Sequence, residues 1–305
     1  MPLVRVAGDR ANRRLGSAAS HRAVGVQSLP DAIRADPQRA VTGASLRREL
    51  DDAGVMLLTL DRPAARNALD DELTEALSAA LEDAARDART RAIILTGAGE
   101  SFCAGGDLSR FERPWTPSAF RLYSHRLTAL IAGVEQLEKP VIAAINGAVT
   151  GAGTQLALAC DIRLADPNVR IIFREGRLGI IPSHGGVTRL VKLVGLARAR
   201  DVLLGGEELS APDAERLGLI TAVVRDGKVV EAARERAGMA LRRSPEAYAA
   251  AKRLLAIAAD ASLQAGMAAE ALAQTSLIAT PEHRDAVSRA RARSKPSTES
   301  AGRKL

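Results

Sequence analysis

Two turns built from small residues could hold a negatively charged oxygen against the main chain. One is the run Cys103-Ala104-Gly105-Gly106 and the other is Thr150-Gly151-Ala152-Gly153; each follows a short apolar segment. Small side chains let a ligand approach backbone N–H groups closely. The second turn also opens a predicted helix, whose free N–H groups and dipole favour negative charge. If the turns converge, they would form an oxyanion hole, whereas each turn alone also fits a tight bend that simply needs glycine.

The histidines and cysteines indicate neither a metal centre nor a disulfide framework. The four histidines lack the spacing of metal ligands; they are His21, His125, His184 and His283. Two cysteines in a chain of 305 residues fit a reducing compartment. Cys103 lies beside the first turn, but a nucleophilic thiol would need an activating base. We therefore interpret Cys103 as a small residue of the core.

Alternating strands and helices must position the two turns. Short apolar runs predict strands at Val55–Leu60, Arg91–Thr96, Val141–Ile145, Ile162–Leu164 and Ile171–Phe173. Helical periodicity predicts helices over 70–87, 117–137, 151–159, 186–193, 197–204, 211–216 and 228–242, with two or three more within 245–293. This alternation indicates an α/β fold, and the helix-rich end indicates a separate helical layer.

The positive charge is confined to the two ends of the chain. The net charge is +7, yet residues 1–40 carry seven arginines against three aspartates, and residues 282–305 carry seven basic against three acidic residues. We therefore expect four regions: a disordered basic extension at 1–48, a core at 49–242, a helical region at 243–296 and a tail at 297–305. The basic extension at 1–48 also fits an organellar transit peptide. No segment is long and apolar enough to predict a membrane span.

Six motifs follow one another along the chain: Leu58–Leu69, Ile94–Leu108, Lys139–Gly153, Ala159–Asp166, Leu178–Pro182 and Ala214–Ile220. Together they resemble the crotonase (enoyl-CoA hydratase/isomerase) superfamily along most of residues 50–296. The resemblance implies an α/β fold, a crotonase-like ββα superhelix with two roughly perpendicular sheets and a helical C-terminal region. It also implies an acyl-CoA thioester substrate, and a homotrimer or a dimer of trimers as the assembly.

The resemblance assigns the two oxyanion donors to the N–H groups of Gly106 and Ala152. Alanine stands where the family prefers glycine, so the N–H is kept while the Cβ narrows the pocket and restricts φ. Substrate binding, including the adenine end of coenzyme A, is assigned to Arg66, Ala68, Ala104, Gly105, Asp107 and Leu108. Asp107 also fits a structural carboxylate that accepts local N–H bonds and fixes the loop.

Acid–base chemistry is implied at two positions, of which only one carries a carboxylate. Family hydratases place two glutamates over the substrate, and the matching positions here are Glu175 and Gln155. Glutamine can orient a water or a carbonyl but cannot shuttle a proton. A single carboxylate suffices for a 1,3-proton shift. Alternatively, Glu175 is a surface or salt-bridged carboxylate near Arg174 and Arg177, and Gln155 is a passive helix residue.

Two further groups of residues are candidates for a role in the site. His184 follows Pro182-Ser183 and either polarises a substrate group, together with Ser183, or simply begins a helix near a subunit surface. In the family, the segment that often lines the acyl pocket corresponds here to the one holding Trp115, Phe120, Tyr123 and His125.

We expect an enoyl-CoA hydratase or double-bond isomerase that stabilises a thioester enolate. It would act in the cytoplasm, without metal, membrane association or any cofactor beyond the coenzyme A of its substrate. An alternative on the same site is an acyl-CoA hydrolase or decarboxylase. Two other classes are a nucleic-acid-binding relative and a non-catalytic scaffold that kept the fold. Nucleic-acid binding is disfavoured because aromatics make up 2% of the chain and none is interleaved with the arginines of the ends.

Overall fold

The computed structural model describes residues 45–112, 114–206 and 208–293. Residues 1–44 of the expected extension lie outside these described residues, as does the expected tail at 297–305. The first strand, β1 (Leu46–Leu50), includes residues 46–48, which the predicted division had placed in the extension. Only its first residue is buried. An edge strand with this mostly polar sequence lacks the apolar alternation by which strands are predicted.

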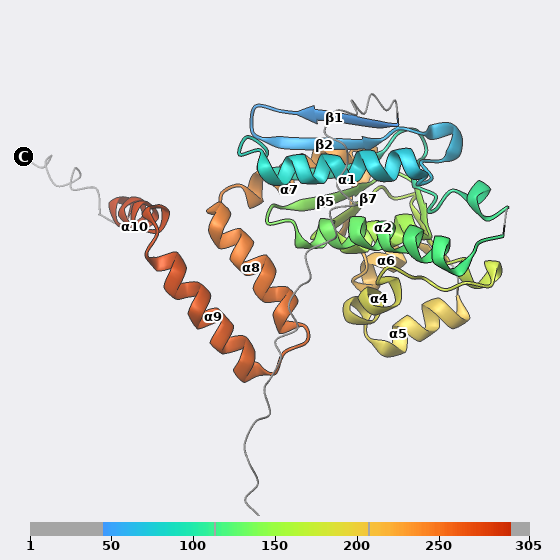
Figure 1. Ribbon diagram of the computed structural model, residues 1–305. Coiled ribbons are helices and arrows are strands. Elements are labelled where there is room, and N and C mark those ends of the chain that lie inside the picture. The colour runs from blue at the N-terminus through green and yellow to red at the C-terminus, as the bar shows by residue number, and fades with distance from the viewer. Residues whose placement is uncertain (1–44, 113, 207, 294–305) are drawn as a thin grey trace, which may run out of the picture. The chain divides into compact units, whose positions relative to one another are not determined.

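Strand β1 lies at the edge of a six-stranded sheet (Figure 1). It pairs antiparallel with β2 (Val55–Leu60), and the order across the sheet is β1-β2-β3-β5-β7-β10. All pairs from β2 to β10 are parallel. The remaining strands are β3 (Ala92–Gly97), β5 (Val141–Ile145), β7 (Ile162–Ala165) and β10 (Ala222–Val223). Every residue of β3 and β5 is buried, as parallel strands are when both faces of the sheet are covered.

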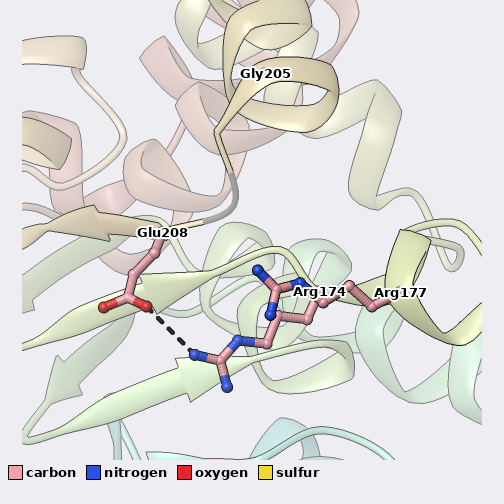
Figure 2. Close-up of a pocket in the computed structure, with 4 residues that line it drawn as sticks. All are labelled: Arg174, Arg177, Gly205 and Glu208. Carbon is pink, nitrogen blue, oxygen red and sulfur yellow. Dashed lines mark hydrogen bonds and ion pairs between the residues drawn. The ribbon is translucent and has the colours of Figure 1, made fainter.

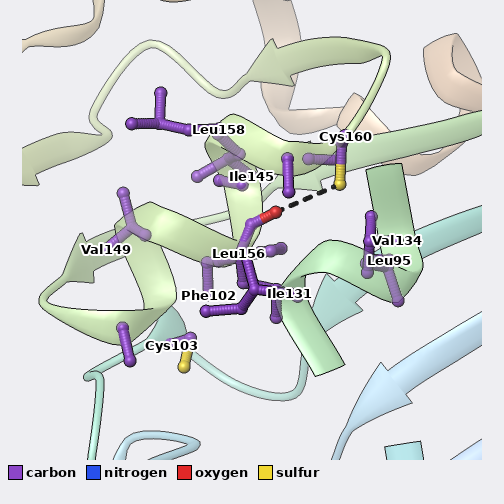
Figure 3. Close-up of a cluster of buried hydrophobic side chains, with 14 of the residues drawn as sticks. Leu95, Phe102, Cys103, Ile131, Val134, Ile145, Val149, Leu156, Leu158 and Cys160 are labelled. Carbon is purple, nitrogen blue, oxygen red and sulfur yellow. Dashed lines mark hydrogen bonds between the residues drawn. The ribbon is translucent and has the colours of Figure 1, made fainter. Parts of the chain in front are cut away.

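Helices bury the residues of this sheet in two separate apolar clusters. The smaller cluster joins α7 (Val229–Ala240) to β2, β3, β5 and β7. The larger cluster contains the apolar sides of α1 (Asp71–Arg86), α2 (Pro117–Gln136) and α3 (Ala152–Ala159). Figure 3 shows its centre, where Leu156 of α3 lies among Phe102, Ile131 and Ile145. Every residue of α3 is buried, so the helix that carries the second turn is held on all sides.

A second sheet of four short strands carries the turns. It is ordered β4-β6-β8-β9, with β4 (Ser101–Cys103), β6 (Ala148–Thr150), β8 (Arg170–Ile172) and β9 (Glu208–Ser210). The pairs β4–β6 and β6–β8 are parallel, and β8–β9 is antiparallel. The predicted α/β class with two sheets and a helical C-terminal region is confirmed. Of these four strands only β8 was predicted, because three residues are too few to show a period of two.

The remaining helices follow the second sheet along the chain. They are α4 (Gly186–Val194), α5 (Leu196–Arg200) and α6 (Ala211–Leu217), followed after α7 by α8 (Pro245–Ala258), α9 (Leu263–Ile278) and α10 (Pro281–Arg293). The helix predicted over 197–204 is split, since α5 gives way to a π-helical turn, η5 (Asp201–Gly205). Shorter 3-10 turns are η2 (Pro63–Ala65), η3 (Leu108–Phe111), η4 (Glu175–Leu178) and η6 (Arg225–Gly227).

The C-terminal helical region is tied to the core by a largely buried ion pair. Lys252 of α8 lies 2.9 Å from the carboxylate of Asp161, which also accepts a hydrogen bond from the Tyr248 hydroxyl. By contrast, α9 buries none of its residues. Within the part of the chain that the structure describes, no helix combines the length and the apolarity needed to cross a membrane.

Candidate active site

Three parallel strands of the small sheet bring the predicted catalytic residues to one edge. Gly106 comes three residues after β4, Ala152 two residues after β6, and Glu175 three residues after β8. These strands are neighbours and run in the same direction. Because the carboxyl ends of parallel strands meet at one edge, where ligands of α/β proteins usually bind, the three segments that follow them lie close together.

The two small-residue turns are packed backbone against backbone. Gly105 has φ of +90°, a conformation that side chains rarely adopt. A Cβ added to Gly105 would lie 2.9 Å from the carbonyl oxygen of Thr150 and 3.1 Å from the amide nitrogen of Ala152. Glycine is therefore required at 105 both by its conformation and by the contact. The predicted convergence of the two turns is present in the structure.

Both predicted oxyanion donors are free of partners among the described residues. On either side of Gly106 the chain is fixed: the Leu69 N–H donates to the Gly105 carbonyl at 2.7 Å, and the Asp107 N–H donates to the Leu69 carbonyl at 3.1 Å. The Gly106 N–H itself makes no hydrogen bond there. Ala152 is the first residue of α3, so its N–H has no partner within the helix. Two amides on adjoining turns are thus available to a ligand oxygen.

A buried asparagine holds the segment at 66–69 against the first turn. The Asn67 side chain donates to the carbonyls of Ala98 at 3.0 Å and Ser101 at 2.7 Å, and accepts from the Arg62 N–H at 2.9 Å. Its φ is +58°, in the left-handed region that asparagine tolerates better than most residues. The Arg66 carbonyl in turn accepts from the Ala104 N–H at 2.9 Å. This structural role of Asn67 was not predicted from the sequence.

The residues predicted to bind substrate lie in or near the two segments that Asn67 holds together. The side chain of Arg66 is exposed, Ala68 is buried, and Leu108 is 61% exposed. The Asp107 carboxylate accepts hydrogen bonds from the Ser109 hydroxyl and N–H at 2.8 and 3.1 Å. The Ser109 hydroxyl is the main cause that lowers the pKa of Asp107, with help from Arg62 at 3.2 Å. These contacts give Asp107 the structural role considered above, while its contact with substrate stays a prediction.

Glu175 and Gln155 form a buried pair beside the two turns. Their exposed fractions are 7% and 3%. The Gln155 Nε2 donates to Glu175 Oε1 at 3.2 Å, whereas Glu175 Oε2 and Gln155 Oε1 have no partner within the described residues. Burial raises the pKa of Glu175, and the hydrogen bonds from its own N–H and from Gln155 only partly oppose this. Glu175 is therefore not the exposed carboxylate of the alternative interpretation.

The arginine that precedes Glu175 points to a different place. Arg174 is exposed and lies 3.3 Å from Glu208 of β9, in a hollow of about 440 Å³ that is also lined by Arg177 and Gly205 (Figure 2). The lining of this hollow is mostly charged and contains no large apolar side chain. The hollow is thus unsuited to an acyl chain. Among the described residues its only carboxylate is that of Glu208, which pairs with Arg174, so Arg174 is not a partner of Glu175.

His184 and Cys103 have structural surroundings. His184 has φ of +53°, and its Nδ1 lies 2.9 Å from the Thr128 hydroxyl of α2, so it joins the loop after Glu175 to that helix. Burial lowers the pKa of His184. Burial also raises the pKa of the Cys103 thiol to about 12, so a thiolate is not available at neutral pH. Both observations favour the packing roles over the catalytic ones.

The chain is similar in sequence and in structure to known enoyl-CoA hydratases and isomerases. The family model described as enoyl-CoA hydratase/isomerase matches residues 51–299. The chain is 40% identical to 2,3-dehydroadipyl-CoA hydratase of Escherichia coli (strain K12) over 234 residues, 77% of this chain and 91% of that protein. It is 39% identical to 1,2-epoxyphenylacetyl-CoA isomerase of the same strain over 191 residues, 60% of this chain and 71% of that protein. The crystal structure of an enoyl-CoA hydratase from Bacillus anthracis superposes with a TM-score of 0.78 at 33% identity, covering 82% and 96% of the two chains.

The chain belongs to the enoyl-CoA hydratase/isomerase family, within the crotonase superfamily. It is an enzyme with the enoyl-CoA hydratase/isomerase function of that family, and acyl-CoA thioesters are its class of substrate. The similar proteins include hydratases as well as an isomerase. Family membership alone therefore does not specify the reaction, which depends on the residues of the site.

Proposed function

We propose that the enzyme moves a double bond in an enoyl-CoA by a 1,3-proton shift. The observation that carries this proposal is the buried pair in which one carboxylate, Glu175, faces one amide, Gln155, at 3.2 Å. A single carboxylate can remove a proton from one carbon and deliver a proton to another. The raised pKa of Glu175 supports this role, because proton transfer is most effective when the pKa of the group lies near the working pH.

In the proposed reaction the amides of Gly106 and Ala152 hold the thioester oxygen. Glu175 removes a proton from C2 of a 3-enoyl-CoA, and the electron pair of the C–H bond passes into the thioester as a dienolate whose oxygen receives two N–H bonds. Glu175 then returns the proton to C4, which gives the 2-enoyl-CoA. Hydrogen bonds placed in advance where charge develops are usually the largest contribution to such catalysis. The adenine end would lie against Arg66, Ala68 and Ala104.

A second candidate is hydration, with Gln155 orienting the attacking water. It is favoured by the unpaired Gln155 Oε1, which can accept a hydrogen bond from water. Incubation of crotonyl-CoA and trans-3-hexenoyl-CoA in D₂O, followed by mass spectrometry, separates the candidates. The proton shift gives a 2-enoyl product without the mass of an added water, and deuterium enters this product to the extent that the proton held by Glu175 exchanges with solvent. A 3-hydroxyacyl product from crotonyl-CoA, with no isomerisation of the 3-enoyl ester, would rule out the first candidate.

Gln155→Glu is expected to increase the rate of water addition by about tenfold or more, since it supplies the second acid–base group that two-carboxylate hydration uses. The two carboxylates would lie about 3 Å apart, so the acid side of the pH–rate profile should move to higher pH. Gln155→Leu, which removes the amide without adding a carboxylate, is the matched control. Equal hydration rates in the two variants would show that position 155 takes no part in activating water.

We further propose that the protein assembles as a homotrimer or a dimer of trimers. The support is that α9 buries none of its residues and exposes large apolar side chains on more than one side, with Leu263, Met267 and Leu272 82%, 58% and 73% exposed. Exposed apolar groups on this scale usually mark an interaction site. Light scattering should give three or six times the 32.1 kDa of one chain. A mass of one chain at micromolar concentration would contradict this assembly.

We also propose that no cofactor is needed beyond the coenzyme A of the substrate, and that the enzyme works in the cytoplasm. In the proposed reaction Glu175 moves the proton and two amides hold the charge, so no redox or metal chemistry is required. Two unpaired, buried cysteines, Cys103 and Cys160, fit a reducing compartment.

A further inference from the structure

Four aromatic side chains gather beside the first turn. The chain has only four phenylalanines, two tyrosines and one tryptophan, yet Phe111, Trp115, Phe120 and Tyr123 lie in contact with one another and are called the aromatic cluster below. Trp115 and Tyr123 have ring centroids 5.3 Å apart, and Trp115 and Phe120 meet edge to face at 5.7 Å. Phe111 completes the cluster at 6.2 Å from Trp115.

The aromatic cluster borders the amide that is proposed to hold the thioester. A Cβ added to Gly106 would lie 2.9 Å from the Tyr123 hydroxyl oxygen and 3.9 Å from a ring carbon of Phe111. The rings of Tyr123 and Phe111 therefore lie beside the residue whose N–H is proposed to hold the thioester oxygen. The cluster is continuous with the candidate active site.

The aromatic cluster is not an ordinary part of the core. Phe111 and Phe120 are 40% and 41% exposed. The indole Nε1 of Trp115 is buried and has no hydrogen-bond acceptor among the described residues. Buried N–H groups are normally satisfied, so the indole of Trp115 lacks, in the described part of the chain, a partner that a core residue usually has. A flat ring seated on the cluster would cover the exposed carbon of Phe111 and Phe120.

Arg110 holds the aromatic cluster in place from one side. Its guanidinium carbon lies 4.9 Å from the ring centroid of Tyr123 and 6.0 Å from that of Trp115, which are cation–π distances. An ion pair with Asp71 at 2.6 Å fixes the guanidinium. The rings are thereby oriented before any ligand arrives, which lowers the entropy lost on binding.

We propose that the enzyme selects acyl-CoA thioesters whose acyl group carries an aromatic ring a few carbons from the carbonyl. The proposal rests on the proposed function only in placing the thioester at Gly106 and Ala152. Aromatic pairs gain energy beyond the area they bury, through offset or edge-to-face contact. A saturated ring of similar size buries at least as much carbon but lacks that gain. The sign of the preference thus separates recognition of aromaticity from simple hydrophobic binding.

The test compares the affinities of 3-phenylpropanoyl-CoA and 3-cyclohexylpropanoyl-CoA, which differ only in the aromaticity of the ring. We expect the phenyl ester to bind about tenfold more tightly in calorimetry. Because Trp115 is the single tryptophan of the chain, its fluorescence should also change on binding of the phenyl ester. In Phe111→Leu and Trp115→Leu the preference should fall to about twofold or less. Leu122→Ala is the control, since Leu122 lies on α2, the helix that also carries Phe120 and Tyr123, and its side chain is 50% exposed.

Equal or tighter binding of the cyclohexyl ester by the unmodified enzyme would overturn the inference. An unchanged preference in Phe111→Leu and Trp115→Leu would also do so, by locating the ring elsewhere. These affinities do not depend on turnover, so they decide the inference even if trans-3-hexenoyl-CoA is not isomerised. Failure of isomerisation would instead count against the proposed function alone.

Discussion

Ala152→Pro should lower kcat for trans-3-hexenoyl-CoA by about 10²–10³-fold, because it deletes one of the two proposed oxyanion donors. Proline has no N–H, and its ring carbon would occupy the place of the lost hydrogen. Ala152 is the first residue of α3, a position that proline fills without breaking a helix. The substitution therefore removes a single donor from a helix that can still form.

The matched control for this proline is Ala152→Gly. It keeps the N–H, removes the Cβ and should keep kcat at or above that of the unmodified enzyme. Circular dichroism and melting temperatures would confirm that both variants are folded. If the folded proline variant retained full kcat, the Ala152 amide would not hold the developing charge. In that case the proposed pairing of Gly106 with Ala152 would have to be abandoned.

Glu175→Gln should reduce turnover by about 10²–10⁴-fold, the usual contribution of a general acid–base group. The same substitution should make the protein more stable at neutral pH by about 1 kcal/mol, because a buried charged oxygen without a partner is replaced by a neutral amide. In a chain of this size that corresponds to a rise of about 2–4 °C in melting temperature. A gain in stability together with a loss of activity would distinguish a catalytic carboxylate from a structural one.

The sign of the pH dependence follows from the raised pKa of Glu175. The folded protein holds the proton to higher pH than the unfolded chain does, because the glutamate carboxyl of the unfolded chain has its ordinary pKa of 4.5. As pH rises from 4.5 through the raised pKa, the unmodified protein therefore loses stability relative to Glu175→Gln. The two melting temperatures should agree below pH 4.5 and separate above it. Turnover should rise over the same window, as the carboxylate becomes able to accept a proton.

Glu208→Gln is the control for both measurements. Glu208 lies on β9 and pairs with Arg174 at the surface, so its replacement should change neither turnover nor the sign of the stability curve. A stability difference for Glu175→Gln that stays constant from pH 4 to pH 8, or a variant that turns over normally, would remove Glu175 from the proposed role.

The positions of Gly106, Ala152 and Glu175 could be anticipated because each follows a strand and stands in a motif of fixed order. The elements that bring them together were harder to predict. β4 and β6 have three residues each, and such strands are recognised by their pairing rather than by local periodicity. Strand β1 was missed because most of its side chains face solvent.

Contacts between side chains from distant segments could not be predicted from the sequence. The hydrogen bond between Gln155 and Glu175 joins residues 20 apart, on a helix and on the loop after a different strand. Local propensity says nothing of such a pairing, because it depends on how α3 packs behind the small sheet. The same holds for Asn67, whose three backbone partners become neighbours only after the strands have paired. The gathering of aromatic rings beside Gly106 is likewise a property of the folded chain.

The backbone-to-backbone contact of Gly105 with Thr150 and Ala152 has a consequence for how this enzyme can change over generations. Ordinary amino-acid replacements alter side chains and leave amide hydrogens in place. The proposed hydrogen bonds from main-chain amides to the thioester oxygen are thus unaffected by most amino-acid replacements, whereas the side chains at positions 155 and 175 can be exchanged. One scaffold could in this way pass from one reaction to another through a single altered codon, without first losing its ability to bear the charged intermediate.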